Sequence, residues 1–97
     1  MRYSFDAPKL ASNVRKHLVW FEEAYRFEWA DALIELDTRK HYRETRFQAF
    51  GYIGNRLYCM VYCLRENSVR LISLRKANPR EVKYYATTKT RNRVSDT

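Results

Sequence analysis

The sequence predicts an α+β fold with two N-terminal helices, an antiparallel sheet of three to four strands and a short C-terminal helix. Three observations support this prediction. Apolar residues recur at helical spacing in the first thirty positions. Strand-like runs joined by short polar links fill the middle of the chain, and a helix-capping signal follows them. The chain has 97 residues, which is enough for one domain and too short for two.

The two N-terminal helices are predicted from a cap and from apolar spacing. A first helix is expected over residues 7–17, because Asp6 is a typical N-cap and Pro8 is tolerated in a first helical turn. A second helix is expected over residues 20–30, along an apolar stripe that begins at Phe21.

The sheet is predicted from four runs of residues. Residues 33–36 are expected to form a short strand. Longer strand-like runs follow at residues 45–53, 56–64 and 68–76. A Gly54-Asn55 turn and a three-residue polar link join the longer runs, and links this short imply antiparallel neighbours. The run 56–64 is apolar on both faces, so we expect it to be the central strand.

The C-terminal helix is predicted from a capping box. Asn78 is followed by Pro79 and Glu81, each at the position where it favours a helix start. We therefore expect a helix over residues 79–86. Residues 87–97 are polar and basic with no apolar period, and they are predicted to form a disordered tail after a single domain of residues 1–86.

The charge of the chain favours a polyanionic partner. The net charge is +8, with a pI of about 9.8. Residues 1–38 contain 5 basic and 7 acidic residues, whereas residues 39–97 contain 14 basic and 4 acidic residues. A phosphate backbone would therefore meet the C-terminal part. No apolar run approaches the roughly 20 residues of a membrane helix, and the N-terminus lacks the apolar stretch of a signal peptide, so a cytoplasmic protein is expected.

The two cysteines are expected to be free and buried. Cys59 and Cys63 lie in one predicted strand, where four residues span about 13 Å, beyond the roughly 7 Å limit for a disulfide. Neither His17 nor His41 has ligand-like spacing to them, so the sequence predicts no metal site. No motif indicates a cofactor.

Basic residues on the predicted strands are the most informative feature. Those of the run 68–76 alternate between two faces, with Ser73 and Arg75 on one face and Arg70 and Lys76 on the other. Arg46 and Arg65 lie in or beside the adjoining strands. Arginines held on strands can clamp a phosphate with two hydrogen bonds. Ordinary surface charge on a sheet is the alternative interpretation.

Several short stretches occur in the order found in one protein family. The strongest is Arg-Leu-Ile-Ser-Leu-Arg-Lys-Ala at residues 70–77, and others are residues 13–17, 21–24 and 44–46. On these stretches the chain resembles the BrnT toxins of bacterial type II toxin–antitoxin operons, over about residues 5–85.

The resemblance implies a fold similar to the RelE ribonuclease toxins and an activity that cleaves RNA and slows translation and growth. It also implies a cognate antitoxin with a ribbon-helix-helix DNA-binding part, which neutralises the toxin. The complex would bind operator DNA through the antitoxin and repress its own operon, as an assembly of two toxins with two antitoxins.

RNA cleavage of this kind needs no metal, because the 2′-OH of the RNA is the nucleophile. It requires a base, an acid and positive charge beside the phosphorus. The candidate catalytic residues are Arg46, Arg65, Arg70, Ser73, Arg75 and His17, and the candidate RNA-binding residues are Lys76, Arg80, Lys83 and Tyr84.

Alternatives stay open at three of these points. His17 is the side chain suited to proton transfer, or it is a satisfied histidine at a helix end. Glu81 is a site residue or completes the capping box, and the cap is favoured. The chain as a whole is an endoribonuclease, or a non-catalytic basic module that binds nucleic acid or a partner protein.

Overall fold

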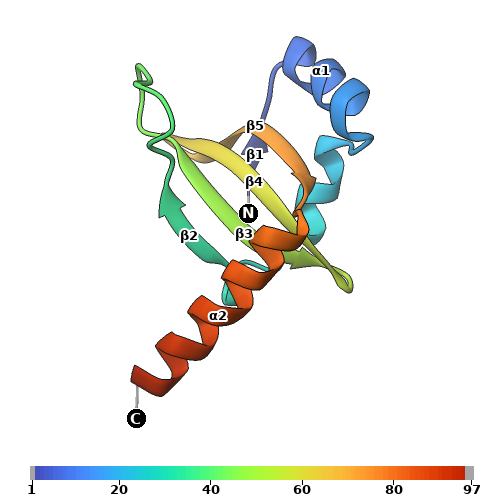
Figure 1. Ribbon diagram of the computed structural model, residues 1–97. Helices are drawn as coiled ribbons and strands as arrows, with labels where there is room; N and C mark the ends of the chain where they lie inside the picture. The colour runs from blue at the N-terminus through green and yellow to red at the C-terminus, as the bar shows by residue number, and fades with distance from the viewer. Residues whose placement is uncertain (1, 96–97) are drawn as a thin grey trace.

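The computed structural model describes residues 2–95 and has one sheet flanked by helices (Figure 1). In chain order the elements are β1 (Tyr3–Ser4), α1 (Ala7–His17), the 3₁₀ helices η1 (Phe21–Arg26) and η2 (Trp29–Asp31), β2 (Leu33–Leu36), β3 (Phe47–Ile53), β4 (Arg56–Arg65), β5 (Ser68–Lys76) and α2 (Pro79–Ser95). The strand order is β1-β5-β4-β3-β2. The run that is apolar on both faces is indeed the central strand, β4.

The prediction of two N-terminal helices is wrong. In the described part of the chain α1 is the only α-helix before β2, and the segment predicted as the second helix contains the 3₁₀ helices η1 and η2 instead. α1 is terminated by Leu18, which adopts a left-handed conformation with φ 58°. Phe21, Ala24 and Phe27 are all buried and are spaced by three residues, which is the period of a 3₁₀ helix.

The predicted antiparallel sheet of three to four strands is also wrong, because the sheet is mixed and has five strands. β1 runs parallel to β5, pairing Tyr3 with Val69 and Ser4 with Arg70. Two paired residues are too few to give a periodic signal in a sequence.

α2 is longer than the predicted helix over residues 79–86. It continues to Ser95 and so includes most of the segment predicted as a tail, whose last two residues lie outside the described part. No helix within residues 2–95 is long and apolar enough to cross a membrane.

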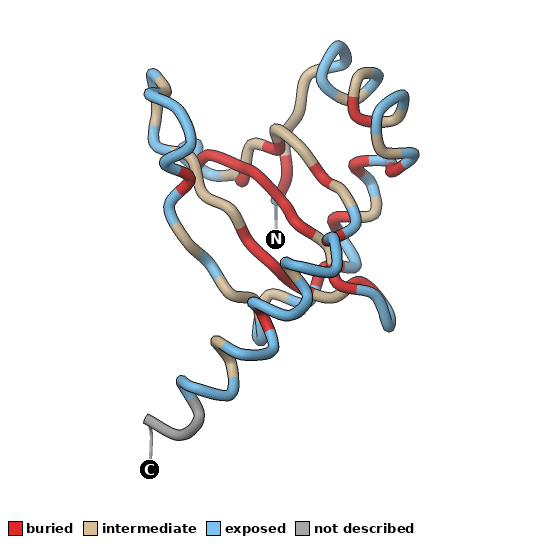
Figure 2. Tube along the Cα trace, viewed as in Figure 1, coloured by how far each residue is buried: buried red, intermediate tan, exposed pale blue. Residues whose placement is uncertain are grey.

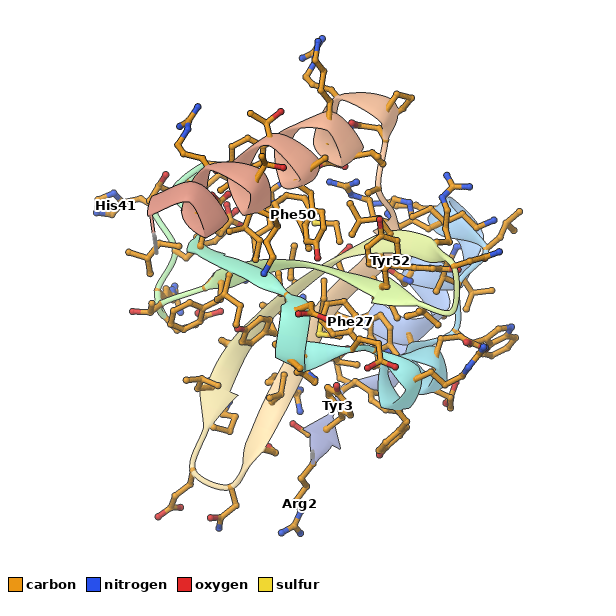
Figure 3. The ribbon with its side chains drawn as sticks, turned by 90° about the horizontal axis from the view of Figure 1, so that it is seen from below. Arg2, Tyr3, Phe27, His41, Phe50 and Tyr52 are labelled. Atoms are coloured by element: carbon orange, nitrogen blue, oxygen red, sulfur yellow. The ribbon has the colours of Figure 1, made fainter. Side chains whose placement is uncertain are left out.

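One side of the sheet, which we call the closed face, is covered by η1 and η2. Phe21 and Phe27 pack there against Met60 and Leu71 in the larger of two core clusters. Phe27 lies so close to Gly51 that a Cβ at that position would be 2.4 Å from the phenylalanine ring. Figure 3 shows Phe27 and Phe50 on opposite sides of the sheet.

The other side, which we call the open face, is covered by α2 over part of its area. Tyr85 of α2 packs in a smaller cluster with Phe50 and Leu57, and its hydroxyl donates to the carbonyl of Asp31 at 2.8 Å. Figures 1 and 2 show α2 crossing one end of the sheet and then extending past it. The part of the open face that α2 leaves uncovered lies between α1 and the loop of residues 37–46.

Candidate nucleic-acid interface

A β-bulge brings Arg70 and Arg75 to the same side of the sheet. Arg70 is paired with Cys63 and Arg75 with Cys59, and these two cysteines share a face of β4 because they are four residues apart. Strict alternation predicted opposite faces for the two arginines. That prediction is wrong, because the register shifts between Val61 and Tyr62 and shifts the alternation of β5 by one residue.

The same register places the other predicted residues of β5. Ser73 is paired with Val61, so it shares the open face with both arginines. Lys76 is paired with Tyr58, whose ring packs against the core of the closed face. The structure therefore separates Lys76 from the open-face group.

Arg46 and Arg65 lie at the end of the sheet beside the loop of residues 37–46. Arg46 precedes β3, and its Nε is 3.0 Å from the Glu44 carboxylate. Its guanidinium lies over the Tyr42 ring, 4.1 Å from the ring centroid. The hydrogen bond from Arg46 lowers the pKa of Glu44, and the nearby charge of Arg65 adds to that effect. Both arginines thus border a carboxylate that stays ionised at neutral pH.

Arg75 is fully engaged by a carboxylate. Its two terminal nitrogens donate to Glu81 at 2.7 and 2.8 Å. Glu81 also accepts from the backbone of Asn78, and the Asn78 side chain accepts from the backbone of Glu81, so the predicted capping box is present. The hydrogen bond from Arg75 lowers the pKa of Glu81, and the hydrogen bond to Glu81 raises the pKa of Arg75. The pair fixes the start of α2 to the sheet.

Asn13 attaches α1 to the edge of β5. Beyond the short β1 the outer edge of β5 needs other hydrogen-bond partners. The Asn13 amide supplies them, since it accepts from the backbone of Leu74 at 3.0 Å and donates to the carbonyl of Leu74 at 2.7 Å. It also donates to the carbonyl of Val19 at 2.9 Å, which holds the chain reversal after α1. Asn13 is 4% exposed, and all these bonds are inside the protein.

A pocket of about 200 Å³ lies between α1 and the bulge of β5. The residues that line it are Lys9, Ser12, Asn13, Lys16, His17, Ile72 and Ser73. Partial burial lowers the pKa of His17, and the positive charges of Arg75 and Lys16 lower it further. At neutral pH the imidazole is therefore uncharged and can accept a proton.

Of the two arginines of β5, Arg70 has the weaker contacts with other side chains. Its one ion pair joins a terminal nitrogen to the Asp6 carboxylate at 3.4 Å, and its side chain is 31% exposed. Asp6 also caps α1 through the backbone of Lys9. A long single contact on a half-exposed surface contributes little stability, so Arg70 can exchange it for a phosphate at small cost.

Three candidate RNA-binding residues lie on α2. Tyr84 packs edge-on against Phe50 and donates a hydrogen bond to Glu35 of β2. Arg80 and Lys83 are exposed on the same helix. The structure thus places Arg46 and Arg65 beside Glu44 at one end of the sheet, and Arg70, Ser73 and Arg75 on the open face of β5 with His17 at its edge. Of the candidate RNA-binding residues, Lys76 lies on the closed side, and Arg80, Lys83 and Tyr84 lie on α2.

The two cysteines are buried and free, as predicted. Cys59 accepts a hydrogen bond from Gln48 at 3.3 Å, and burial raises its pKa. Within residues 2–95 no three histidine, cysteine, aspartate or glutamate side chains are grouped in a way that would hold a metal ion.

Sequence reasoning missed four polar residues of this surface. Lys9, Ser12 and Lys16 come from α1, and Arg39 comes from the loop of residues 37–46, where its nearby charge helps to lower the pKa of Glu81. The lysines are seven residues apart and thus on one side of a helix, which is a usable signal. Nothing local in the sequence indicates where Arg39 lies.

Two comparisons with known proteins bear on this surface. A family model described as ribonuclease toxin, BrnT, of type II toxin–antitoxin system matches residues 5–81. The matched segment includes Arg46, Arg65, Arg70, Ser73, Arg75 and His17. No curated protein matches the chain.

Proposed function

Because the chain belongs to the BrnT family of ribonuclease toxins of type II toxin–antitoxin systems, we propose that it is an endoribonuclease that cleaves RNA on its open face without a metal. In this reaction a 2′-OH attacks the adjacent phosphorus, and the 5′-oxygen of the next nucleotide leaves. The products carry a 2′,3′-cyclic phosphate and a 5′-OH. The protein then has to supply a base, an acid and positive charge.

One observation supports this proposal: a neutral histidine lies near the positive charges of Arg75 and Lys16, in the pocket that Ser73 of the open face also lines. The charges that lower the pKa of His17 come from Arg75 and Lys16, after the effect of its burial. A base and positive charge are thus neighbours, as the attack of a 2′-OH on its own phosphate requires.

Arg70 is the arginine best placed to bind the phosphate, because its contact with Asp6 is long and single. Ser73 donates a hydrogen bond to a phosphate oxygen from the adjoining pocket. Arg75 acts through its charge and through Glu81, since both of its terminal nitrogens are already engaged. Arg46 and Arg65 hold the RNA strand at the far end of the face.

The family also implies an antitoxin partner. We propose that this antitoxin carries a ribbon-helix-helix DNA-binding part and acts in the cytoplasm in an assembly of two toxins with two antitoxins. Such a complex binds operator DNA through the antitoxin. The antitoxin stops cleavage by covering part of the open face, where free basic charge is concentrated.

The test is cleavage of a labelled RNA by the purified protein in the presence of EDTA. We expect cyclic-phosphate ends, and resistance of an RNA with a single 2′-deoxy nucleotide at the cut. Arg70→Ala should lower turnover about a hundredfold, which is typical for loss of one transition-state donor. Arg56→Ala is the matched control, because Arg56 is exposed at the turn between β3 and β4. Equal turnover in both variants would remove Arg70 from the site.

The pH profile tests His17 separately. Because its pKa is lowered, the neutral base is present down to more acidic pH than for an ordinary histidine. Turnover should rise with pH to a plateau already reached near neutrality, and His17→Gln should remove this acid limb. An unchanged profile in that variant would assign the base to another group.

A further inference from the structure

The loop of residues 37–46 lines a second, open pocket of about 390 Å³, of which the proposed cleavage uses only Arg46. That volume lies within the range typical of small-ligand sites. The side chains that matter for its chemistry are Thr38, Lys40, Tyr42, Glu44, Thr45 and Arg46. His41 also lines the pocket, at the outer part of the loop (Figure 3).

Buried hydrogen bonds hold this loop in one shape. The Asp37 carboxylate accepts from Nε and Nη2 of Arg39, at 2.7 Å each, and from the Tyr42 hydroxyl at 3.3 Å. The Asp37 side chain itself is fully buried. The ring of Tyr42 is therefore fixed before any ligand arrives, so binding there needs little reordering.

Two walls of the pocket have complementary chemistry. The first is a flat stack, in which the Arg46 guanidinium lies 4.1 Å from the centroid of the Tyr42 ring. The second is the Glu44 carboxylate, which is 33% exposed and of which one oxygen accepts from Arg46 at 3.0 Å. Flat aromatic and guanidinium surfaces stack on unpaired bases, and a carboxylate accepts hydrogen bonds from a base edge.

We propose that this pocket binds an unpaired guanine of the RNA cleaved on the open face. Guanine presents two neighbouring donors, N1–H and N2–H, on its Watson–Crick edge, and a carboxylate is the acceptor that can take both. A phosphodiester carries no hydrogen-bond donor, so it cannot pair with the Glu44 carboxylate in this way. Arg46 belongs both to this pocket and to the open face, so a base held here leaves its own phosphate beside the arginines. The inference rests on the proposed function and gives it a base preference.

The experiment measures binding of short 2′-fluoro oligonucleotides, which lack the 2′-OH nucleophile and are not cut. An oligouridine with one central guanosine should bind on the order of tenfold tighter than the all-uridine chain, since pairing with one base edge through two hydrogen bonds typically discriminates against another base by about that factor. Tyr42→Ala and Glu44→Gln should each remove the difference and leave binding of the all-uridine chain in place.

Matched controls come from elsewhere on the surface. Tyr25→Ala removes an exposed tyrosine on η1, and Glu66→Gln neutralises an exposed glutamate in the turn between β4 and β5, so both should keep the guanine preference. Tyr42→Phe removes the hydroxyl bond to Asp37 and keeps the ring, and it should keep the preference as well. This variant separates loss of stacking from loss of loop structure.

Two results would overturn the inference while leaving the proposed function intact. The first is salt-dependent RNA binding that is equal for both oligonucleotides. The second is a guanine preference that survives in Tyr42→Ala, while that variant loses affinity for the antitoxin instead, because the pocket would then hold a protein side chain. Absence of any RNA binding would overturn both proposals.

Discussion

The closed and open faces of the sheet are built from different chemistry. On the closed face, η1 and η2 bury aromatic and aliphatic side chains, among them Phe21, Met60 and Leu71, which are not exposed at all. On the open face, α2 covers one part with apolar contacts, and the remainder carries arginines, a histidine and hydroxyl groups. A single sheet thus has one side buried in an apolar core and one side that is partly polar and exposed to solvent.

The difference indicates where stability and function reside. Burial of large apolar side chains is the main source of folding free energy. Half-exposed ion pairs such as Arg70–Asp6 add little and can be exchanged for contacts with a ligand. We therefore expect variants of the closed face to change stability first, and variants of the open face to change RNA binding and turnover first.

The largest effect is expected for Phe21→Ala on the closed face. Removing a fully buried phenylalanine leaves a cavity and typically costs about 3–5 kcal/mol. Urea unfolding should show this loss of stability. Tyr84→Ala on α2 is the comparison, because Tyr84 is 44% exposed and should cost about 1 kcal/mol. Equal losses for the two variants would contradict the assignment of stability to the closed face.

A smaller loss of stability is expected when the Arg75–Glu81 ion pair is removed, because this pair fixes α2 to the sheet. Arg75 and Glu81 are mostly buried and share two hydrogen bonds. Arg75→Ala and Glu81→Ala should each cost about 2 kcal/mol, with a coupling energy of about 1–2 kcal/mol in the double variant. Arg70→Ala should cost less than about 0.5 kcal/mol. A coupling near zero would show that the pair does not hold α2.

Some elements of the two faces could be predicted from the sequence and others could not. The central position of β4 followed from a run that is apolar on both faces, and the start of α2 followed from the capping box at Asn78. Both signals are local. The closed face was only half predicted, because a stripe of Phe21, Ala24 and Phe27 fits a 3₁₀ period as well as an irregular α-helix.

The open face required long-range information. The register of β5 depends on an extra residue opposite β4, and no residue in the run 68–76 marks a bulge. The strand β1 is too short to be visible, and the attachment of α1 depends on Asn13 meeting Leu74, 61 residues away. These pairings decide which charges meet, so the sequence could not predict how the candidate residues are grouped.

Low pH should destabilise the loop beside the open face through Asp37. The hydrogen bonds of Asp37 with Arg39 lower its pKa to about 2. A carboxyl whose pKa is lowered on folding stabilises the protein above its unfolded pKa, near 3.8, and this contribution is lost as the pH falls towards 2. The contribution should be about 2 kcal/mol. We expect the wild type to lose that much more stability than Asp37→Asn between pH 5 and pH 2. Parallel curves for the two proteins would show that the pair is not formed in solution.

The smallest effect is expected for the salt dependence of RNA binding when one of two lysines, Lys16 or Lys76, is replaced. Lys16 lines the pocket beside Ser73, whereas Lys76 is paired with Tyr58 on the closed side. Each phosphate contact on single-stranded RNA adds about 0.7 to the slope of log affinity against log salt concentration. Lys16→Ala should therefore make the slope shallower by about 0.7, and Lys76→Ala should leave it unchanged, although the two variants remove the same charge. Salt titrations of binding to a 2′-fluoro oligonucleotide measure both slopes under the same conditions. If the two slopes fell equally, RNA would contact both sides of the sheet, and the division between a closed face for stability and an open face for function would not hold.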